Sequence, residues 1–584
     1  MPVKSFLRSK VAIIVVLALA TALTFQCVRR FQFLGMDDHV YVWNNDAVKK
    51  GFTPEGIRWA LCADLCFPDN QADYWQPMTF LSRMLDVQLF GMDPGAHHLV
   101  NLFFHILNAS LLFIILWLFT RRQYLSFLAA LLFALHPLNS EVLGWVTARK
   151  DVLSHFFALT SMALYFYWGK ISWKKYALLV VIFAFGLMSK PTVIVLPALL
   201  FMMECMRFDG QFWLENIKSA LRKTWPFFLV ALAYFPIPWI GQPHAFKDAV
   251  NPPVLKAVSA YGFYLQKILW PSDLTLYGPV PYSPVNGRGV GITVFVLGSI
   301  TALAMKFYRR EKMLAVGWGV FLICMLPSVF IDWPADRFTY LSKAGILIML
   351  VWAFALWRPK VRLLCLALAG VIAYIVLSVH AIMFWQNDQI LMERALRFYP
   401  NNYAAHNLLG VWYGQRSDLV KAEGHLQNAI DIYPGRDKPW ANLGNIRMEQ
   451  KRYDEARRLF RESLKRNPDD YQTITNLGNA YINLKDYKRA IEVYQEALKL
   501  RPNERQILNN MAIAYLADGD PQEALKLAEG LQDARLYFFL GARAYEAGDK
   551  SLAIEMLERS VNLNPESGAR AVELIRKIQG GDSN

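Results

Sequence analysis

Long apolar runs alternate with short basic stretches through the first two thirds of the 584-residue chain. A run of roughly 17–25 apolar residues can cross a bilayer as a helix, and the pattern up to residue 385 predicts about eleven such spans. Because basic loops favour the cytoplasmic side, the pattern predicts a cytoplasmic N-terminus and an outward C-terminus. The spans lie near 11–28, 99–120, 124–141, 152–169, 176–189, 191–206, 224–241, 289–306, 313–331, 343–357 and 363–385.

One further apolar segment, 254–270, decides whether the two ends of the chain lie on opposite sides. Its Tyr, Gln, Lys and Trp side chains favour an interfacial helix that does not cross. A crossing would put the basic stretch 306–312 outside, against the positive-inside tendency. The first span has a basic start and could instead be a cleaved signal, but we favour an uncleaved span. Either choice leaves residues 37 and 38 outside the cytoplasm.

The first outer loop, about 29–97, is rich in Trp, Asp and Pro. Trp59, Trp75 and the amphipathic run 80–90 predict helices that lie at the membrane surface. Cys62 and Cys66 are close in this loop, and an oxidising compartment would permit a disulfide between them. The six cysteines of the chain form no metal-ligand pattern.

From residue 400 onward the pattern changes to amphipathic helices with a period of 34 residues. A unit of this length, with small residues at helix crossings and a closing proline, is the tetratricopeptide signature. We therefore predict an all-α chain: a polytopic helical membrane domain over 1–385, a connector over 386–400, and a tetratricopeptide superhelix over 401–584 with about five repeats and a capping helix. The recurring residues are Pro400, Pro434, Pro468 and Pro502, then Gly410, Gly444 and Gly478, then Ala422, Ala456, Ala490 and Ala524.

Composition agrees with a membrane protein, because 55% of the residues are hydrophobic and 14% are aromatic. The net charge of +15 would suggest nucleic acid as a partner of a soluble protein. Here much of the Lys and Arg lies in short loops between spans, where it sets orientation. We therefore discount nucleic acid as a partner.

Two adjacent carboxylates, Asp37 and Asp38, follow shortly after the first span. A carboxylate can act as general base on a hydroxyl, or it can hold a divalent cation. The chain has no nucleotide P-loop, no HExxH and no GxSxG motif. The pair is therefore our candidate catalytic centre, with a structural role as the alternative.

Other polar side chains lie on the second predicted span and in the outer loops. His98, Asn101, His105 and Asn108 share one helical face, where they would line a wet cavity or hydrogen-bond to other helices. His98, nearest the outer surface, is the one we expect to contribute to a site. Cations in the outer loops could bind a phosphate or form ion pairs with nearby carboxylates. The cations are Arg149, Lys150, Lys190 and Arg337, and the carboxylates are Glu141, Asp151 and Asp336.

These motifs and their order resemble the bacterial relatives of the TMTC proteins. Those are transmembrane, tetratricopeptide-bearing O-mannosyltransferases of the GT-C glycosyltransferase superfamily. The resemblance covers nearly the whole chain, and its specificity lies in the order of short motifs. The matching stretches are Asp37-Asp38 with Tyr41 and Asn44, Trp75-Gln76-Pro77 with Leu81-Ser82, 95–108, 136–151 and 336–340.

The resemblance implies transfer of a sugar from a polyprenyl-phosphate donor to an acceptor hydroxyl, with inversion, on the outer side of the membrane. Asp37 or Asp38 would act as the base, and we favour Asp37. By position, Arg149, Lys150 and Arg337 would hold the donor phosphate. A metal is optional because the phosphate is already a good leaving group, and a divalent cation would fall to the Asp pair.

Asn442, Asn476 and Asn510 also recur at 34 residues, in the first helix of successive repeats. Side-chain amides donate and accept, so a ladder of them can hold an extended peptide backbone without reading its sequence. This resembles the asparagine ladder of O-GlcNAc transferase repeats and implies a polypeptide acceptor. Hydrogen bonds between repeats are the alternative.

The sequence thus predicts a multi-pass inner-membrane glycosyltransferase with a periplasmic repeat domain, acting on protein. Its partners would be the lipid bilayer, a lipid-linked sugar and a polypeptide. One alternative enzyme would glycosylate a lipid or a surface glycan. A non-enzymatic alternative is a membrane-anchored scaffold whose repeats recruit envelope proteins.

Overall fold

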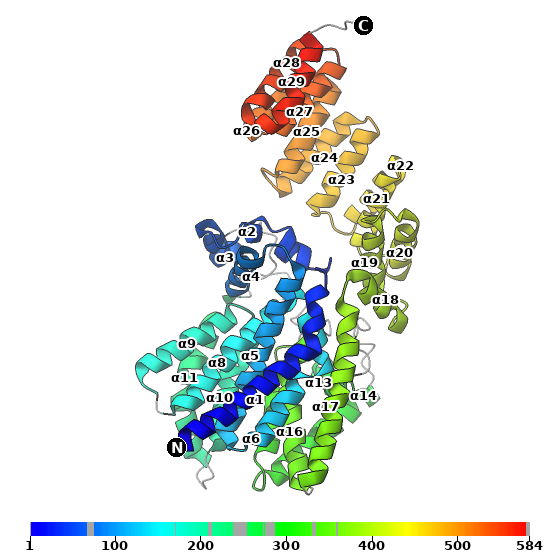
Figure 1. Ribbon diagram of the computed structural model, residues 1–584. Helices are drawn as coiled ribbons and strands as arrows, with labels where there is room; N and C mark the ends of the chain where they lie inside the picture. Colours follow the sequence, from blue (N-terminus) through cyan, green and yellow to red (C-terminus); the bar gives the residue numbers. More distant parts are fainter. Residues whose placement is uncertain are drawn as a thin grey trace. The chain divides into compact units, whose positions relative to one another are not determined.

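The computed structural model describes residues 2–66, 75–169, 171–207, 213–237, 254–271, 274, 287–329, 335–357 and 360–579. These residues form helices and connecting turns, with no strand among them. The chain divides into two compact units, Met1–Asn402 (unit 1) and Tyr403–Asn584 (unit 2), whose helices are labelled in Figure 1. The all-α prediction is confirmed.

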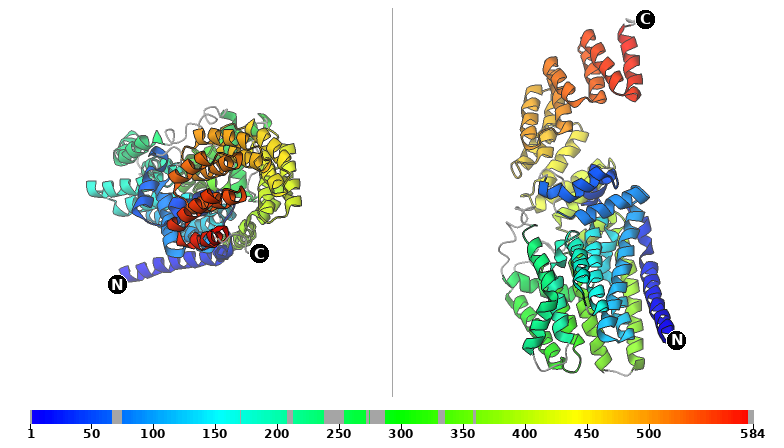
Figure 2. Two further views of the ribbon diagram at one scale, coloured as in Figure 1. Left: turned by 90° about the horizontal axis from the view of Figure 1, so that it is seen from above. Right: turned by 90° about the vertical axis from the view of Figure 1, so that its left-hand side faces the viewer.

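Each predicted span overlaps a helix of unit 1 within the described residues, and these helices run side by side as a bundle (Figure 2). By length and composition, four helices of the described residues qualify as membrane spans, and a fifth qualifies if a bent pair counts as one. Several others are short, so the count of about eleven remains a prediction. The helices are α1 (Pro2–Phe25), α5 (Pro94–Thr120), α6 (Gln123–Ala134), α8 (Arg149–Trp168), α9 (Trp173–Leu187), α10 (Leu196–Arg207), α11 (Trp213–Tyr234), α14 (Gly287–Phe307), α15 (Met313–Met325), α16 (Ser342–Trp357) and α17 (Lys360–Ile382).

The predicted span 124–141 is broken rather than continuous. Helix α6 ends before His136, and a second axis through Pro137–Gly144 is bent from it by 52°. Proline lacks the N–H that would continue the helix, and it pushes the preceding residue into an extended conformation. His136 has φ −68° and ψ 134°, and its side chain accepts a hydrogen bond from the Leu138 amide. The break exposes backbone carbonyls that other helices must satisfy.

Side-chain contacts identify which loops lie together at each of the two ends of unit 1. At one end, Arg122 pairs with Glu311, which joins two of the basic turns. At the other end, Asp38 accepts hydrogen bonds from Thr147, and Arg337 pairs with Glu141. The acidic pair and the cation-bearing loops therefore share one end of the unit, here called the site end. Which end faces the cytoplasm remains a prediction.

Two further helices meet the site end. Helix α13 (Val254–Leu269) reaches it with its last turn, where Lys267 Nζ lies 2.7 Å from Asp336 Oδ1. Helix α18 (Asp388–Phe398) begins there, because Asp388 Oδ2 accepts from the Gly35 amide at 2.8 Å. The chain therefore leaves unit 1 for unit 2 from the end that carries the acidic pair.

The first outer loop contains α2 (Asp46–Lys49), α3 (Pro54–Cys66) and α4 (Pro77–Phe90). Several apolar side chains of α4 and its C-terminal turn are exposed, including Leu89 at 62%. Their position at a membrane surface remains a prediction. The Cys66 side chain lies outside the described residues, so the proposed disulfide with Cys62 does as well.

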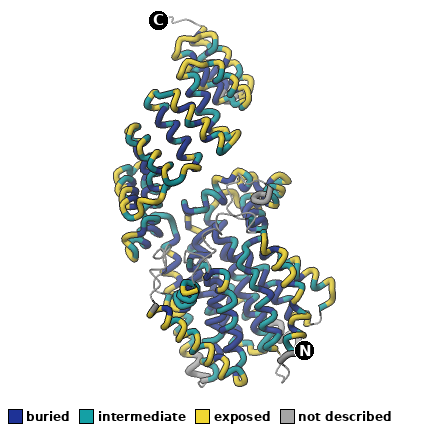
Figure 3. Tube along the Cα trace, turned by 180° about the vertical axis from the view of Figure 1, so that it is seen from behind, coloured by how far each residue is buried: buried dark blue, intermediate teal, exposed yellow. Residues whose placement is uncertain are grey.

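Unit 2 consists of five helix pairs and a final helix. At four of the five crossings a glycine allows close contact, and Ala512 takes this position in the fourth. A Cβ on Gly444 would lie 2.6 Å from the Phe460 ring, and one on Gly478 would lie 2.4 Å from the Tyr494 ring. Buried positions follow these interfaces along the unit (Figure 3). The helices are α19 (Tyr403–Gly414), α20 (Leu419–Ile432), α21 (Lys438–Glu449), α22 (Tyr453–Leu464), α23 (Tyr471–Asn483), α24 (Tyr487–Leu500), α25 (Arg505–Asp518), α26 (Pro521–Leu531), α27 (Ala534–Glu546), α28 (Lys550–Leu563) and α29 (Pro565–Gln579).

Candidate active site

The two adjacent carboxylates have different surroundings. Asp38 is fully buried, and its oxygens accept hydrogen bonds from the Leu34 amide at 2.9 Å, the Thr147 amide at 2.8 Å and the Thr147 hydroxyl. Burial raises the pKa of Asp38 to about 6, against the opposing effect of these donors and of nearby Arg83. Asp38 therefore ties the first outer loop to the segment that precedes α8.

Asp37 is half-buried, and within the described residues no hydrogen bond or ion pair engages its side chain. Its charge nevertheless acts on two cations from other segments. Burial lowers the pKa of Lys150, which precedes the predicted span 152–169, to about 8, and Asp37 opposes this. Burial would also lower the pKa of Arg337, but Glu141, Asp151 and Asp37 together raise it. Asp37 is thus the accessible carboxylate beside a cluster of cations.

Arg149 is engaged entirely within the protein. Its guanidinium is fully buried, pairs with Asp86 at 2.7 Å, and donates to Asn101, to the Ser82 hydroxyl at 2.8 Å and to the His97 carbonyl at 2.9 Å. These partners lie on α4 and α5, whereas Arg149 begins α8. The side chain therefore fastens three helices together at the site end.

The remaining predicted cations each face a carboxylate. Lys190, in the turn between α9 and α10, pairs through Nζ with Asp151 of α8. Arg337 pairs with Glu141, whose second oxygen accepts from the Arg337 amide at 2.9 Å. The side chains of Lys190 and Arg337 keep 12% and 20% exposure, so both remain reachable.

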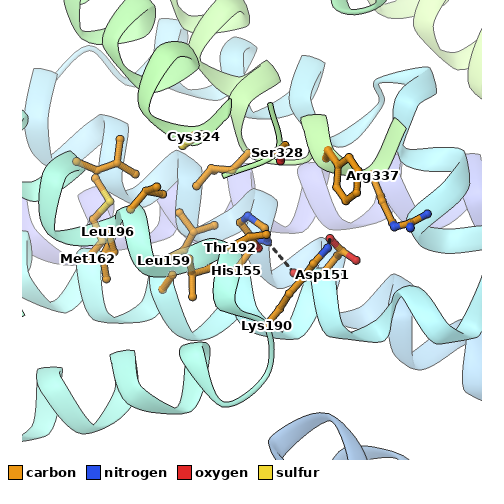
Figure 4. Close-up of a pocket in the computed structure, with 16 residues that line it drawn as sticks. Asp151, His155, Leu159, Met162, Lys190, Thr192, Leu196, Cys324, Ser328 and Arg337 are labelled. Atoms are coloured by element: carbon orange, nitrogen blue, oxygen red, sulfur yellow. Dashed lines mark hydrogen bonds and ion pairs between the residues drawn. The ribbon is translucent and has the colours of Figure 1, made fainter. Parts of the chain in front are cut away.

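A cavity of about 520 Å³, including its open mouth, lies beside these two ion pairs. Figure 4 shows Asp151, Lys190 and Arg337 at one side of it, with Leu159, Met162 and Leu196 at the other. A second cavity of about 410 Å³ is lined by apolar side chains alone. The two share Leu159, Met162, Leu199 and Leu341, so the cavity beside the ion pairs adjoins an apolar trench between α5, α8, α10, α15 and α16.

The polar face of α5 is buried and bonded to other segments. Asn101 donates to the Val142 and Trp145 carbonyls, and His105 contacts the Ala134 carbonyl and the Tyr340 hydroxyl. Asn108 donates to the Val152 carbonyl and the same hydroxyl. Two of these acceptors, the Val142 and Trp145 carbonyls, lie in the bent segment after α6, and the Ala134 carbonyl ends α6. This face therefore bonds α5 to the region of the helix break.

His98 follows the same pattern, although the sequence suggested a role in the site. Its two ring nitrogens lie 3.0 Å from the Leu143 carbonyl and 3.3 Å from the Gln32 carbonyl. The ring is fully buried. In this arrangement His98 positions the loop that leads to Asp37.

The structure also brings forward residues that the sequence patterns did not single out. Arg83 is fully buried, donates to the Thr147 carbonyl at 3.1 Å and lies against Tyr41. His155 lines the charged cavity and bonds through Nδ1 to the Asp151 carbonyl at 2.7 Å. One feature of the sequence could have indicated Arg83. The amphipathic run 80–90 carries two charges three residues apart, Arg83 and Asp86.

The described residues contain no group of three or more His, Cys, Asp or Glu side chains that could hold a metal ion. Asp38 directs its oxygens at three protein donors, so it is poorly placed to share a cation with Asp37. We derive no step through a metal. The divalent cation suggested for the pair remains untested.

The asparagines of unit 2 are paired between repeats. Asn442 Nδ2 donates to Asn407 at 2.9 Å, Asn476 Nδ2 to Asn445 at 3.0 Å, and Asn510 Nδ2 to Asn479 at 2.9 Å. Each of these side-chain amides donates one of its two hydrogens to an asparagine of the preceding repeat. The hydrogen bonds between repeats that the sequence pattern left as the alternative are therefore present. Peptide binding by the same residues remains a prediction.

Comparison with known families places two matches on this chain. Residues 77–240 match the family described as dolichyl-phosphate-mannose-protein mannosyltransferase, and residues 441–505 and 475–536 match the tetratricopeptide repeat. The first match includes Arg149, Lys150 and Lys190. It begins after Asp37 and Asp38 and ends before Arg337.

Among curated proteins, the chain is similar to "Protein O-mannosyl-transferase TMTC1" of Mus musculus, at 33% identity over 129 residues, 20% of this chain and 13% of that protein. It is also similar to "Protein O-mannosyl-transferase TMTC2" of Homo sapiens, at 26% identity over 137 residues, 18% of this chain and 16% of that protein. The matched parts thus span well under a fifth of the relatives' length. The resemblance to TMTC-type proteins is confirmed.

Among solved structures, the tetratricopeptide protein YrrB is similar at 17% identity and a TM-score of 0.27, covering 31% of this chain and 97% of that one. PilF of Pseudomonas aeruginosa is similar at 20% identity and the same TM-score, covering 32% of this chain and 88% of that one.

Proposed function

We propose that this chain is a membrane glycosyltransferase that moves a sugar from a polyprenyl-phosphate donor to an acceptor hydroxyl on the extracytoplasmic face. The observation that supports this best is the amphiphilic shape of the joined cavities. A lipid phosphate needs cations at its head and apolar walls along its tail, and the cavities offer Lys190 and Arg337 above an apolar trench. The similarity to O-mannosyltransferases points the same way.

Asp37 is the base in this proposal. It removes the proton from the acceptor hydroxyl as that oxygen attacks the anomeric carbon of the sugar. The bond between this carbon and the phosphate oxygen breaks, and its electron pair leaves with the lipid phosphate. Because attack and departure occur on opposite faces in one displacement, the product has inverted configuration.

The leaving phosphate gains negative charge during this step, since a phosphodiester becomes a monoester. Lys190, Arg337 and Lys150 lie where that charge would develop, and preorganised cations stabilise such a transition state. Asp151 and Glu141 hold Lys190 and Arg337 in place before substrate arrives. We assign Arg149 and Asp38 a positioning role, because both are saturated by protein partners.

A protein acceptor is favoured by the repeats of unit 2 and by the similarity to protein O-mannosyl-transferases. Transfer to a lipid or surface glycan is the second candidate, and it fits the same donor site. A scaffold without activity would need neither Asp37 beside two cations nor an apolar cavity next to paired cations.

The decisive experiment compares two Asp→Asn variants and the wild type, each as full-length protein in detergent, supplied with a labelled polyprenyl-phosphate sugar. Asp37→Asn should lower turnover by about 10²–10⁴-fold, the usual contribution of a general base, and leave the unfolding temperature unchanged. Asp46→Asn is the matched control, because Asp46 lies in the same loop with its side chain 87% exposed. Full activity in Asp37→Asn would sink the catalytic assignment.

Mass spectrometry of envelope proteins from cells with and without the chain tests the acceptor. A hexose-type mass that disappears from protein with the chain supports the protein acceptor. Loss of the mass from lipid or glycan alone would favour the second candidate.

A further inference from the structure

Unit 2 contains two histidines, His406 and His425, and they touch. Their Nδ1 atoms lie 3.0 Å apart, so one ring donates a hydrogen bond to the other, and the ring centroids lie 5.2 Å apart. His406 belongs to α19 and His425 to α20, so the contact joins the two helices of the first repeat. Both rings are half-buried.

The same contact in later repeats is apolar. Moving both positions by the 34-residue period gives Trp440 with Leu459, then Ile474 with Val493, and then Leu508 with Leu527. All six side chains pack into the apolar clusters of their repeats. Two imidazoles thus replace two apolar side chains at one copy of a repeated helix contact. Two apolar side chains would stabilise this helix contact better than two imidazoles. We therefore look for a chemical role of the histidines.

The spacing of the two nitrogens fits shared ligation of one metal ion. Imidazole nitrogens bind Zn²⁺ at about 2.0–2.1 Å, so two of them on one ion lie about 3.0 Å apart at a right angle and about 3.4 Å apart at the tetrahedral angle. The observed 3.0 Å falls at the lower limit of this range. Imidazole also suits Ni²⁺, Cu²⁺ and Co²⁺ among the divalent metals.

The ring of His425 is fixed in orientation by stacking on its other face. Tyr413 stacks on His425 with an interplanar angle of 6° and a centroid distance of 5.6 Å. Lys421 Nζ lies 5.0 Å from the Tyr413 ring and covers it. A ring packed in this way loses little rotational freedom when it binds an ion, which favours ligation.

We propose that His406 and His425 form a binding site for a divalent transition-metal ion such as Zn²⁺, ligated through both Nδ1 atoms. The described residues supply no third His, Cys, Asp or Glu to this pair, so water completes the coordination. The site therefore exchanges its ion readily, and the bound ion clips α19 to α20 at the start of the repeats. This site is independent of the glycosyltransferase proposal.

The test uses full-length protein purified without a polyhistidine tag and titrated with Zn²⁺ by calorimetry and with Co²⁺ by visible absorption. Wild type should show one saturable site and a higher unfolding temperature with Zn²⁺. The double variant His406→Leu/His425→Leu installs the pair found at 508 and 527. It should lose both effects, and without metal it should unfold at the wild-type temperature or above.

Two more variants keep the result interpretable. His380→Leu removes an exposed histidine of unit 1 and should leave binding unchanged. His425→Gln keeps a polar side chain at the contact and should also lose the site. The proposal is wrong if wild type shows no saturable site, or if the double variant binds Zn²⁺ as wild type does.

Discussion

Unit 1 buries charged side chains at its site end, whereas unit 2 keeps nearly all of its charges near water. Asp38, Arg83 and Arg149 are 0% exposed in unit 1. Among the described charged residues of unit 2, the buried ones are Arg447 at 9% and Asp470 at 8%. Unit 2 is held by apolar crossings that repeat every 34 residues, while the site end is held by ion pairs between segments far apart in sequence.

The difference has an energetic meaning. A buried ion pair stabilises a fold little more than apolar side chains of the same volume, yet removing one partner is costly. Such pairs therefore fix geometry rather than add stability, which suits a region that must hold cations around a carboxylate. Regular apolar crossings add stability along the repeats and leave surface positions open to change.

The largest effect should come from removing the buried cation of unit 1. Arg149→Met removes the guanidinium partner of the buried Asp86 and leaves it the His97 ring nitrogen at 3.4 Å, so it should cost about 3–5 kcal/mol of unfolding free energy. The same substitution in unit 2, Arg489→Met, breaks an exposed pair with Asp486 and should cost about 0–1 kcal/mol. Thermal unfolding in detergent measures both.

The double variant Arg149→Met/Asp86→Leu is the control for this comparison, because it removes both buried charges together. It should recover part of the lost stability. If Arg149→Met costs no more than Arg489→Met, the contrast between the two units is wrong.

A second comparison uses pH. The folded-state pKa of Asp38 is raised from 3.8 to about 6, so the folded protein binds a proton that the unfolded chain releases. This contribution to stability is fully present below pH 4 and is lost as the pH rises through about 6. Between these limits wild type should lose about 3 kcal/mol relative to Asp38→Asn.

Asp418 of unit 2 should behave in the opposite sense. A hydrogen bond from Lys421 lowers the pKa of this partly exposed carboxyl, so its contribution is present above pH 4 and is lost as the pH falls. Unfolding temperatures of wild type, Asp38→Asn and Asp418→Asn between pH 3 and pH 7 give the two profiles. Parallel profiles for the two variants would contradict the assignment of Asp38 as a buried carboxyl.

A third comparison lies within unit 2. Gly444→Ala places a Cβ 2.6 Å from the Phe460 ring and should cost about 1–3 kcal/mol through overpacking. Gly424→Ala, also in a helix but with nothing within 4 Å of the new Cβ, should gain about 0.5–1 kcal/mol. Equal effects of the two substitutions on thermal unfolding would mean that the crossing glycines are not packing positions.

The repeats could be read from the sequence because their packing is periodic. Gly444 and Gly478 are 34 residues apart, and each meets an aromatic ring sixteen positions later in its own repeat. The helices that overlap the predicted spans could be read from the sequence for a similar reason, because the length of an apolar run is a local property. Pro137 is a local signal for the helix break as well. The apolar run 124–141 is nevertheless long enough for one span, so the sequence pattern predicted a continuous helix there.

The site end could be predicted only in part. The grouping of Asp37 with Lys150 and Arg337 followed from topology, because all three precede or follow spans on one side. The division of labour between Asp37 and Asp38 could not be predicted, since it depends on Thr147, which lies 109 residues beyond Asp38. Arg149 is similar: its partner Asp86 occupies a helix whose pattern indicates only an amphipathic surface.

The smallest stability effect, and the sharpest functional one, concerns the asparagines of unit 2. Asn442→Ala, Asn476→Ala and Asn510→Ala each remove one neutral hydrogen bond between repeats and should cost about 0.5–1.5 kcal/mol. Asn483→Ala is the matched control, because Asn483 is exposed on α23 and bonds only to its own helix at the Asn479 carbonyl. If the ladder holds a peptide acceptor, the triple variant should raise KM for peptide and leave KM for the lipid-linked donor unchanged, because the donor cavity lies wholly in unit 1. An unchanged KM for peptide in a folded triple variant would leave these asparagines with a purely structural role, like the buried amides of α5.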